Sequence, residues 1–178
     1  AKDGELITNQ IIDKPKAENG FYISDIKRDI LKIVVQNRYE KEKPSVGFIH
    51  NFGLKYGGMI STIAHDSHNI ICIATNDEVI CSLLKWVNEN NGGIAFSDGN
   101  DIWGIPLPIA GIISNEPAET IAEKYHELEE AVKAAGSKQK SPFMTLSFMS
   151  LLVIPHLKLG NKGLFDVNNF KFVDIYAE

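Results

Sequence analysis

The stretch Met59-Ile60-Ser61-Thr62-Ile63-Ala64-His65-Asp66-Ser67-His68-Asn69-Ile70-Ile71-Cys72-Ile73-Ala74-Thr75 contains a polar cluster between two apolar, β-branched runs. The runs 59–64 and 70–75 predict two strands, and the polar residues between them predict the connection that joins the strands. Side chains on such a connection lie at the end of a sheet, where functional sites are commonly built. The alternative is a polar turn in which Asp66 and Asn69 only satisfy neighbouring backbone groups.

Further strands are predicted on both sides of this pair. The apolar runs that predict them are 30–35, 46–50, 94–96 and 102–105. A first helix is predicted to begin at Thr75, which has capping-box spacing with Glu78, and to end at Gly92-Gly93. Its predicted buried face consists of Val79, Ile80, Leu83, Leu84 and Val87.

A second helix is predicted to begin at Ser114 or Asn115 and to end at Gly136. Its predicted buried face consists of Ala118, Ile121, Ala122, Tyr125, Leu128 and Val132. The run 142–154 is compatible with a buried helix or with a strand. Strands and helices without a βαβ rhythm predict an α+β fold with a mixed or antiparallel sheet and two to three packed helices. We expect one domain over residues 1–178, with an irregular leading segment at 1–28.

Composition and charge exclude several classes of partner. The 178 residues are 44% hydrophobic and 23% charged with a net charge of -5, which is typical of a soluble globular protein. Arg28 and Arg38 are the only arginines and no basic stripe is present, so we expect no nucleic-acid partner. No apolar run is long enough to span a membrane. Cys72 and Cys81 lie in apolar surroundings, which predicts buried, reduced thiols and a cytoplasmic protein.

The polar cluster contains the strongest candidates for chemistry but no complete metal site. His65 and His68 have His-x-x-His spacing on a turn, whereas zinc peptidases place two histidines one helical turn apart beside a glutamate. Ser67 lacks the Gly-x-Ser-x-Gly elbow of a hydrolase nucleophile. Distant histidines would be needed to complete a metal site, and these are His50, His126 and His156. We therefore expect no metal site in this chain.

A set of segments carries a family resemblance. They are Asp29–Ile33, Gly53–Lys55, Ile63–Ile71, Thr75–Glu78, Leu107–Ile112, Ser114–Ala118, Pro142–Phe148 and Ile154–Leu159. Together and in this order they resemble the C-terminal domain of bacterial adenine deaminases of the amidohydrolase superfamily. Several matches in one order are more specific than any single motif. The resemblance implies that residues 29–178 form the matching core of this domain.

The resemblance also implies an activity and a missing part. The family's reaction is hydrolytic deamination of adenine to hypoxanthine and ammonia, with manganese or iron in an N-terminal (β/α)-barrel activating water. This sequence lacks the superfamily's His-x-His pair, and 178 residues are too few for a barrel together with this domain. We therefore expect the barrel and its metal outside this chain, as a domain or subunit that is its partner. A homo-oligomer is left open.

We expect the polar cluster to face the mouth of that barrel. The catalytic candidates are His65, Asp66 and His68, and the candidates for binding adenine or supporting the metal site are Ser67 and Asn69. This placement comes from polarity and position in the chain rather than from the resemblance. The alternative is a non-catalytic structural or oligomerisation module, with the runs 106–113 and 143–148 as its interface.

Overall fold

A six-stranded antiparallel sheet forms the centre of the computed structural model, which describes residues 1–2 and 4–176. The strand order is β4-β3-β6-β5-β7-β8. The strands are β3 (Ile30–Gln36), β4 (Ser45–His50), β5 (Gly58–Ser61), β6 (Ile70–Ala74), β7 (Gly93–Ser97) and β8 (Ile102–Pro106). Every neighbouring pair runs antiparallel, which confirms the predicted α+β fold class.

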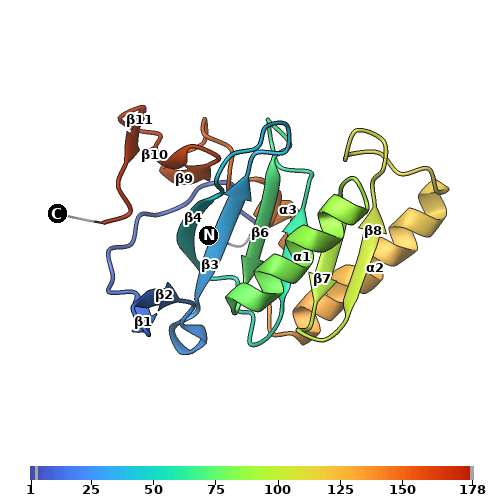
Figure 1. Ribbon diagram of the computed structural model, residues 1–178, viewed down its shortest axis with the longest axis horizontal. Coiled ribbons are helices and arrows are strands. Elements are labelled where there is room, and N and C mark those ends of the chain that lie inside the picture. The colour runs from blue at the N-terminus through green and yellow to red at the C-terminus, as the bar shows by residue number, and fades with distance from the viewer. Residues whose placement is uncertain (3, 177–178) are drawn as a thin grey trace.

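Helices cover both faces of this sheet. Helix α1 (Asp77–Glu89) lies on one face, and α2 (Ala118–Ala134) and α3 (Pro142–Ser147) lie on the other (Figure 1). Strand β6 shows the consequence, because Cys72 belongs to the core beneath α1 whereas its neighbours Ile71 and Ile73 belong to the core beneath α2 and α3. A strand buried on both faces has no polar positions, so it appears in the sequence as an uninterrupted apolar run.

Helix α1 begins with a different cap from the one that was predicted. The Asn76 side chain accepts a hydrogen bond from the Val79 backbone N–H at 2.9 Å, which makes Asn76 the N-cap. The Thr75 hydroxyl instead donates to the Gly57 carbonyl at 3.0 Å. The predicted Thr75–Glu78 capping box is therefore wrong. The Thr75 side chain is hydrogen-bonded to Gly57, next to the start of β5, and does not cap α1. The buried face of α1 is as predicted, with Leu84 only partly buried.

The second and third helices are shorter than predicted. Helix α2 starts at Ala118 rather than at Ser114 or Asn115, because the Ser114 hydroxyl accepts from the Glu116 N–H in a turn that precedes Pro117. Of its predicted buried face only Leu128 and Val132 are buried; Ile121 and Tyr125 are half-buried, and Ala118 and Ala122 are exposed. The run 142–154 is helical only over α3, and the rest is a compact series of turns.

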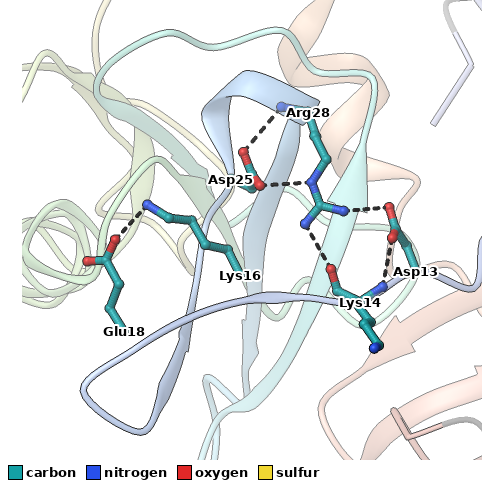
Figure 2. A network of polar contacts seen from close by, with 6 residues as sticks. All are labelled: Asp13, Lys14, Lys16, Glu18, Asp25 and Arg28. Atoms are coloured by element: carbon teal, nitrogen blue, oxygen red, sulfur yellow. Dashed lines mark hydrogen bonds and ion pairs between the residues drawn. The ribbon is translucent and has the colours of Figure 1, made fainter.

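The leading segment is more ordered than its sequence suggests. It contains a small hairpin of β1 (Lys16–Glu18) and β2 (Phe21–Ile23), followed by a 3-10 turn, η1 (Ile26–Arg28). Figure 2 shows how the Arg28 guanidinium holds this segment by donating to the Asp25 carboxylate, the Asp13 carboxylate and the Lys14 carbonyl at 2.8–2.9 Å. Hydrogen bonds to a single guanidinium thus stabilise this segment in place of the apolar contacts that it lacks.

Residues after 155 add a second, three-stranded sheet that contacts β4. Its strands are β9 (Leu157–Gly160), β10 (Gly163–Asp166) and β11 (Lys171–Val173), in the order β11-β10-β9. Among the described residues, no helix could cross a membrane. Both cysteines are free thiols; Cys72 is buried as predicted, but Cys81 is exposed on the solvent side of α1, so its predicted burial is wrong.

Candidate functional site

Residues His65–Asn69, which we call the candidate turn, lie at one end of the six-stranded sheet. Strand β5 ends earlier than predicted, at Ser61, so an extended connection leads to the turn before β6 begins at Ile70. The register of the sheet brings the end of β3 to the same place, since Gln36 is paired with Ile70. The start of β7 and the end of β8 lie at this end too. Loops distant in sequence therefore meet around the turn.

The two histidines of the turn are half-buried, and the end of α3 holds His65. The His65 ring stacks on the Phe148 ring with centroids 4.6 Å apart, and its backbone N–H donates to the Ser147 carbonyl at 3.0 Å. The His68 ring centroid lies 6.0 Å from that of His65. The Nδ1 atom of His68 is buried and has no hydrogen-bond partner among the described residues. The structure therefore brings the two imidazoles side by side, with unused hydrogen-bonding capacity on His68.

The other three residues of the turn divide into exposed and buried groups. Asp66 and Ser67 are exposed, whereas Asn69 is only 4% exposed. The Asn69 side chain accepts from the Arg38 backbone N–H at 3.3 Å and donates to the Ser67 hydroxyl at 3.0 Å. Asn69 thus holds the shape of the turn, while the Asp66 carboxylate remains available to a ligand or partner.

Arg38 and Tyr39 belong to this site, and the sequence analysis did not include them. The Tyr39 hydroxyl donates to the Ser67 carbonyl at 2.8 Å and accepts from the Arg38 guanidinium at 2.9 Å. The same guanidinium donates to the carbonyl of Ala110. This pair joins the loop after β3, the candidate turn and the loop after β8. In the sequence, Arg38 stands out only as one of two arginines, and this rarity does not indicate where the residue lies in the fold.

A small cavity opens beside the turn, with a volume of about 230 Å³. Its polar lining comes from Asp66, Ser67, Asn69, Ser150 and Asn161, and its apolar wall is formed by Val35 and residues 151–153. Ser150 is 7% exposed, and its hydroxyl has no hydrogen-bond partner in the described part of the chain. The imidazoles of His65 and His68 do not line this cavity, so the five predicted residues divide between two adjoining surfaces.

The residues of the site do not fit a metal ion. Within residues 1–2 and 4–176, no group of three or more His, Cys, Asp or Glu side chains could hold one. The three distant histidines do not join His65 and His68. His50, His126 and His156 are exposed on other elements, and the His156 Nδ1 lies 3.0 Å from the Asn168 Oδ1. Two imidazoles without a further ligand do not make a protein metal site.

Comparison with known proteins assigns the family. The model of the adenine deaminase C-terminal domain matches residues 5–171. A protein of Methanosarcina mazei called adenine deaminase is 50% identical over 178 residues, which are 100% of this chain and 32% of that protein. Adenine deaminases of Methanosarcina barkeri and Parabacteroides distasonis are 50% and 43% identical over 99% of this chain and 32% of their own length. The chain spans about a third of these relatives, and it belongs to the adenine deaminase C-terminal domain family.

Proposed function

We propose that this chain is the C-terminal domain of a cytoplasmic enzyme of purine metabolism that hydrolyses adenine to hypoxanthine and ammonia. The observation that carries the proposal is the match of the whole chain, at 50% identity, to a protein called adenine deaminase. The chain spans 32% of that relative, and the proposal places the larger part of the catalytic machinery in the remaining length. The two free thiols, Cys72 and Cys81, support a reducing compartment.

We place the metal in the part of the enzyme outside the matched third. The described residues of this chain offer no set of three ligands that could hold it. When bound, a manganese or iron ion supplies an activated water molecule. The expected holder is an N-terminal barrel domain, which would then be the direct partner of this chain. What the residues of this chain can do is bind, orient and exchange protons.

The candidate turn has the chemistry for that supporting role. The exposed Asp66 carboxylate can accept hydrogen bonds from the amino group or a ring N–H of adenine. The imidazoles of His65 and His68 can donate or accept a proton, as departing ammonia requires. The hydrogen bonds of Asn69 and Ser67 hold the backbone that presents these groups. We therefore propose that the turn faces the catalytic part of the enzyme.

The test joins this chain to the preceding two thirds of the Methanosarcina mazei relative and follows adenine deamination with manganese or iron(II). We expect the joined protein to be active and the chain alone to be inactive. Activity of the chain alone would contradict the placement of the metal. Asp66→Asn and His68→Gln should each lower kcat by about tenfold to a hundredfold, which is the range for outer-shell groups that support a catalytic metal site.

The matched control for these variants is His126→Gln, which changes an exposed histidine on α2, away from the turn. It should leave both kcat and thermal stability unchanged. If Asp66→Asn and His68→Gln behave like His126→Gln, the catalytic assignment of the turn is wrong while the family assignment stands.

One observation supports a second function, that of a structural module without chemistry. Three large apolar side chains near the turn are strongly exposed: Ile109 is 50%, Ile113 is 53% and Met144 is 52% exposed. They belong to the two runs that the sequence analysis considered as an interface. In this case Ile113→Lys and Met144→Lys would weaken attachment to the rest of the enzyme without changing kcat of the assembled protein. Unchanged attachment would contradict this function.

A further inference from the structure

The cavity beside the candidate turn lies where the two sheets meet. Its lining comes from Val35 on β3, from Asp66 and its neighbours in the turn, from residues 150–153 after α3, and from Gly160 and Asn161 at the end of β9. Its volume of about 230 Å³ is smaller than the range of about 300–1,000 Å³ that is usual for drug-sized ligands. The cavity therefore suits a small molecule, of the size of a free nucleobase rather than of a nucleotide.

One wall of the cavity is apolar and fixed by the fold. Val35 and Leu151 are buried, and the Leu151 N–H donates to the Phe148 carbonyl at 3.3 Å. Leu152 lies directly against β9, because a Cβ at Gly160 would be only 3.1 Å from its side chain. A wall that is already in place lowers the entropic cost of binding a ligand. Aliphatic side chains of this kind pack well against the face of a flat ring.

The polar side of the cavity has hydrogen-bonding capacity that the fold does not use. Ser150 is 7% exposed, and its hydroxyl has no hydrogen-bond partner among residues 1–2 and 4–176. The exposed Asp66 carboxylate remains available. A carboxylate can only accept hydrogen bonds, whereas a hydroxyl can both donate and accept. These two groups suit a ligand that offers an N–H donor and, beside it, a second polar atom.

The charges around the cavity disfavour an anionic ligand. Of the described residues that line it, Asp66 alone is charged. A second carboxylate stands close by, since the Asn161 Nδ2 lies 3.4 Å from the Glu42 Oε2. Two cations of the neighbouring loops are engaged elsewhere: the charge of Lys162 acts on Glu42, and the Arg38 guanidinium donates to a carbonyl and to a tyrosine hydroxyl. A phosphate group in the cavity would have no cation to offset its loss of water.

We propose that this cavity binds the free adenine base. The apolar wall would cover one face of the purine ring, Asp66 would accept a hydrogen bond from the amino group, and Ser150 would bind a ring nitrogen. The inference rests on the proposed function, because the names of the relatives select adenine among small ring compounds with N–H donors. His65 and His68 do not line the cavity, so the base would lie beside the imidazoles, in an entry position that precedes the chemical step.

The test is a titration of the isotope-labelled 178-residue chain with adenine, without added metal, followed by its amide NMR signals. We expect saturable shifts at Ser67, Ser150 and Asn161. Adenosine monophosphate should not produce them, because its phosphate would meet only carboxylates. Ser150→Ala and Asp66→Asn should each raise the dissociation constant for adenine by about tenfold or more, equivalent to about 1.4 kcal/mol. In the joined protein, Ser150→Ala should raise KM for adenine.

The matched controls lie at the opposite end of the six-stranded sheet. Ser137→Ala changes a serine that is 7% exposed, as Ser150 is, and that lies next to Gly53. Asp101→Asn changes an exposed carboxylate in the turn from β7 to β8. Both variants should bind adenine like the unmodified chain. Thermal unfolding shows which variants are folded, and the exposed Asp66→Asn position keeps the test valid if Ser150→Ala does not fold.

Adenine that shifts no signal around the cavity would overturn the proposal. So would folded Ser150→Ala and Asp66→Asn variants that bind adenine as tightly as Ser137→Ala and Asp101→Asn. These results are separate from the activity test of the proposed function. A joined protein that deaminates adenine while the chain alone does not bind it would remove the cavity and keep the enzyme. Binding by the chain together with an inactive joined protein would keep the cavity and contradict the proposed enzyme.

Discussion

The imidazole of His65 lies almost parallel to the phenyl ring of Phe148, with ring centroids 4.6 Å apart and an angle of 25° between the planes. The backbone of Phe148 is fixed in turn by β9, because its carbonyl accepts a hydrogen bond from the buried Lys158 Nζ at 3.1 Å. A cation on β9 is thereby connected through the end of α3 to a histidine of the candidate turn. The orientation of His65 therefore depends on α3 and β9, two elements outside the candidate turn.

Removing the ring of Phe148 should release His65. We expect Phe148→Ala to lower kcat of the joined deaminase and to lower the free energy of unfolding by about 1–3 kcal/mol, because a half-buried aromatic ring is lost. Phe148→Tyr keeps the stacking ring and should retain both properties. Steady-state kinetics and urea unfolding measure the two effects. Full kcat in Phe148→Ala would show that the stacking has no role in catalysis.

Arg38 should act as a positioning residue for the turn. Arg38→Lys retains the charge but loses the guanidinium fork that reaches the Ala110 carbonyl and the Tyr39 hydroxyl. We expect a loss of about 1–2 kcal/mol in unfolding free energy and shifted amide NMR signals at Ser67 and Asn69.

The control for this prediction is Arg28→Lys, the only other arginine, which lies in the network of Figure 2. It should change signals near Asp13 and Asp25 and leave those of the candidate turn in place. Equal shifts at Ser67 in both variants would mean that the effect is not specific to the Arg38 contacts.

Lys158 should make stability rise with pH in the alkaline range. The side chain is 1% exposed, and its burial lowers the pKa from 10.5 to about 8. Between these two values the unfolded chain binds a proton that the folded chain does not, so the free energy of unfolding increases with pH, by up to about 1.4 kcal/mol per pH unit.

Urea unfolding between pH 8 and pH 10.5 measures this slope. Lys158→Met should flatten it, whereas Lys171→Met, at an exposed lysine on β11, should not. A slope that is the same in Lys158→Met and in the unmodified chain would assign the pH dependence to other groups.

The observed N-cap of α1 is Asn76, whereas the sequence motif predicted a Thr75–Glu78 capping box, and substitutions can distinguish the two. Asn76→Ala removes the hydrogen bond to the Val79 N–H and should lower the unfolding free energy by about 1 kcal/mol. Glu78→Ala removes the acid of the predicted capping box, which is not formed, and should have a smaller effect. Thermal unfolding of the two variants measures the difference, and a larger loss in Glu78→Ala would contradict the observed cap.

The six central strands and the two long helices could be predicted because they depend on local patterns, whereas β1, β2 and the sheet of β9, β10 and β11 were not predicted. The apolar runs of β3, β6 and α1 are long and regular, so their position follows from periodicity alone. The start of α2 and the extent of α3 could not be predicted in this way. Both are decided by hydrogen bonds of turns and by packing against the sheet, which compete with helix formation at Ser114 and after Ser147.

By itself the sequence determined the fold class, the family and the polar turn at the end of the sheet, because these follow from apolar periodicity and from residues in fixed order. Only the tertiary structure decided which side chains share the site. Strand register brings Arg38 and Tyr39 to Ser67, and the packing of α3 places Phe148 on His65. Contacts between residues 28 or more positions apart depend on how sheets and helices pack, and no local pattern in the chain records them.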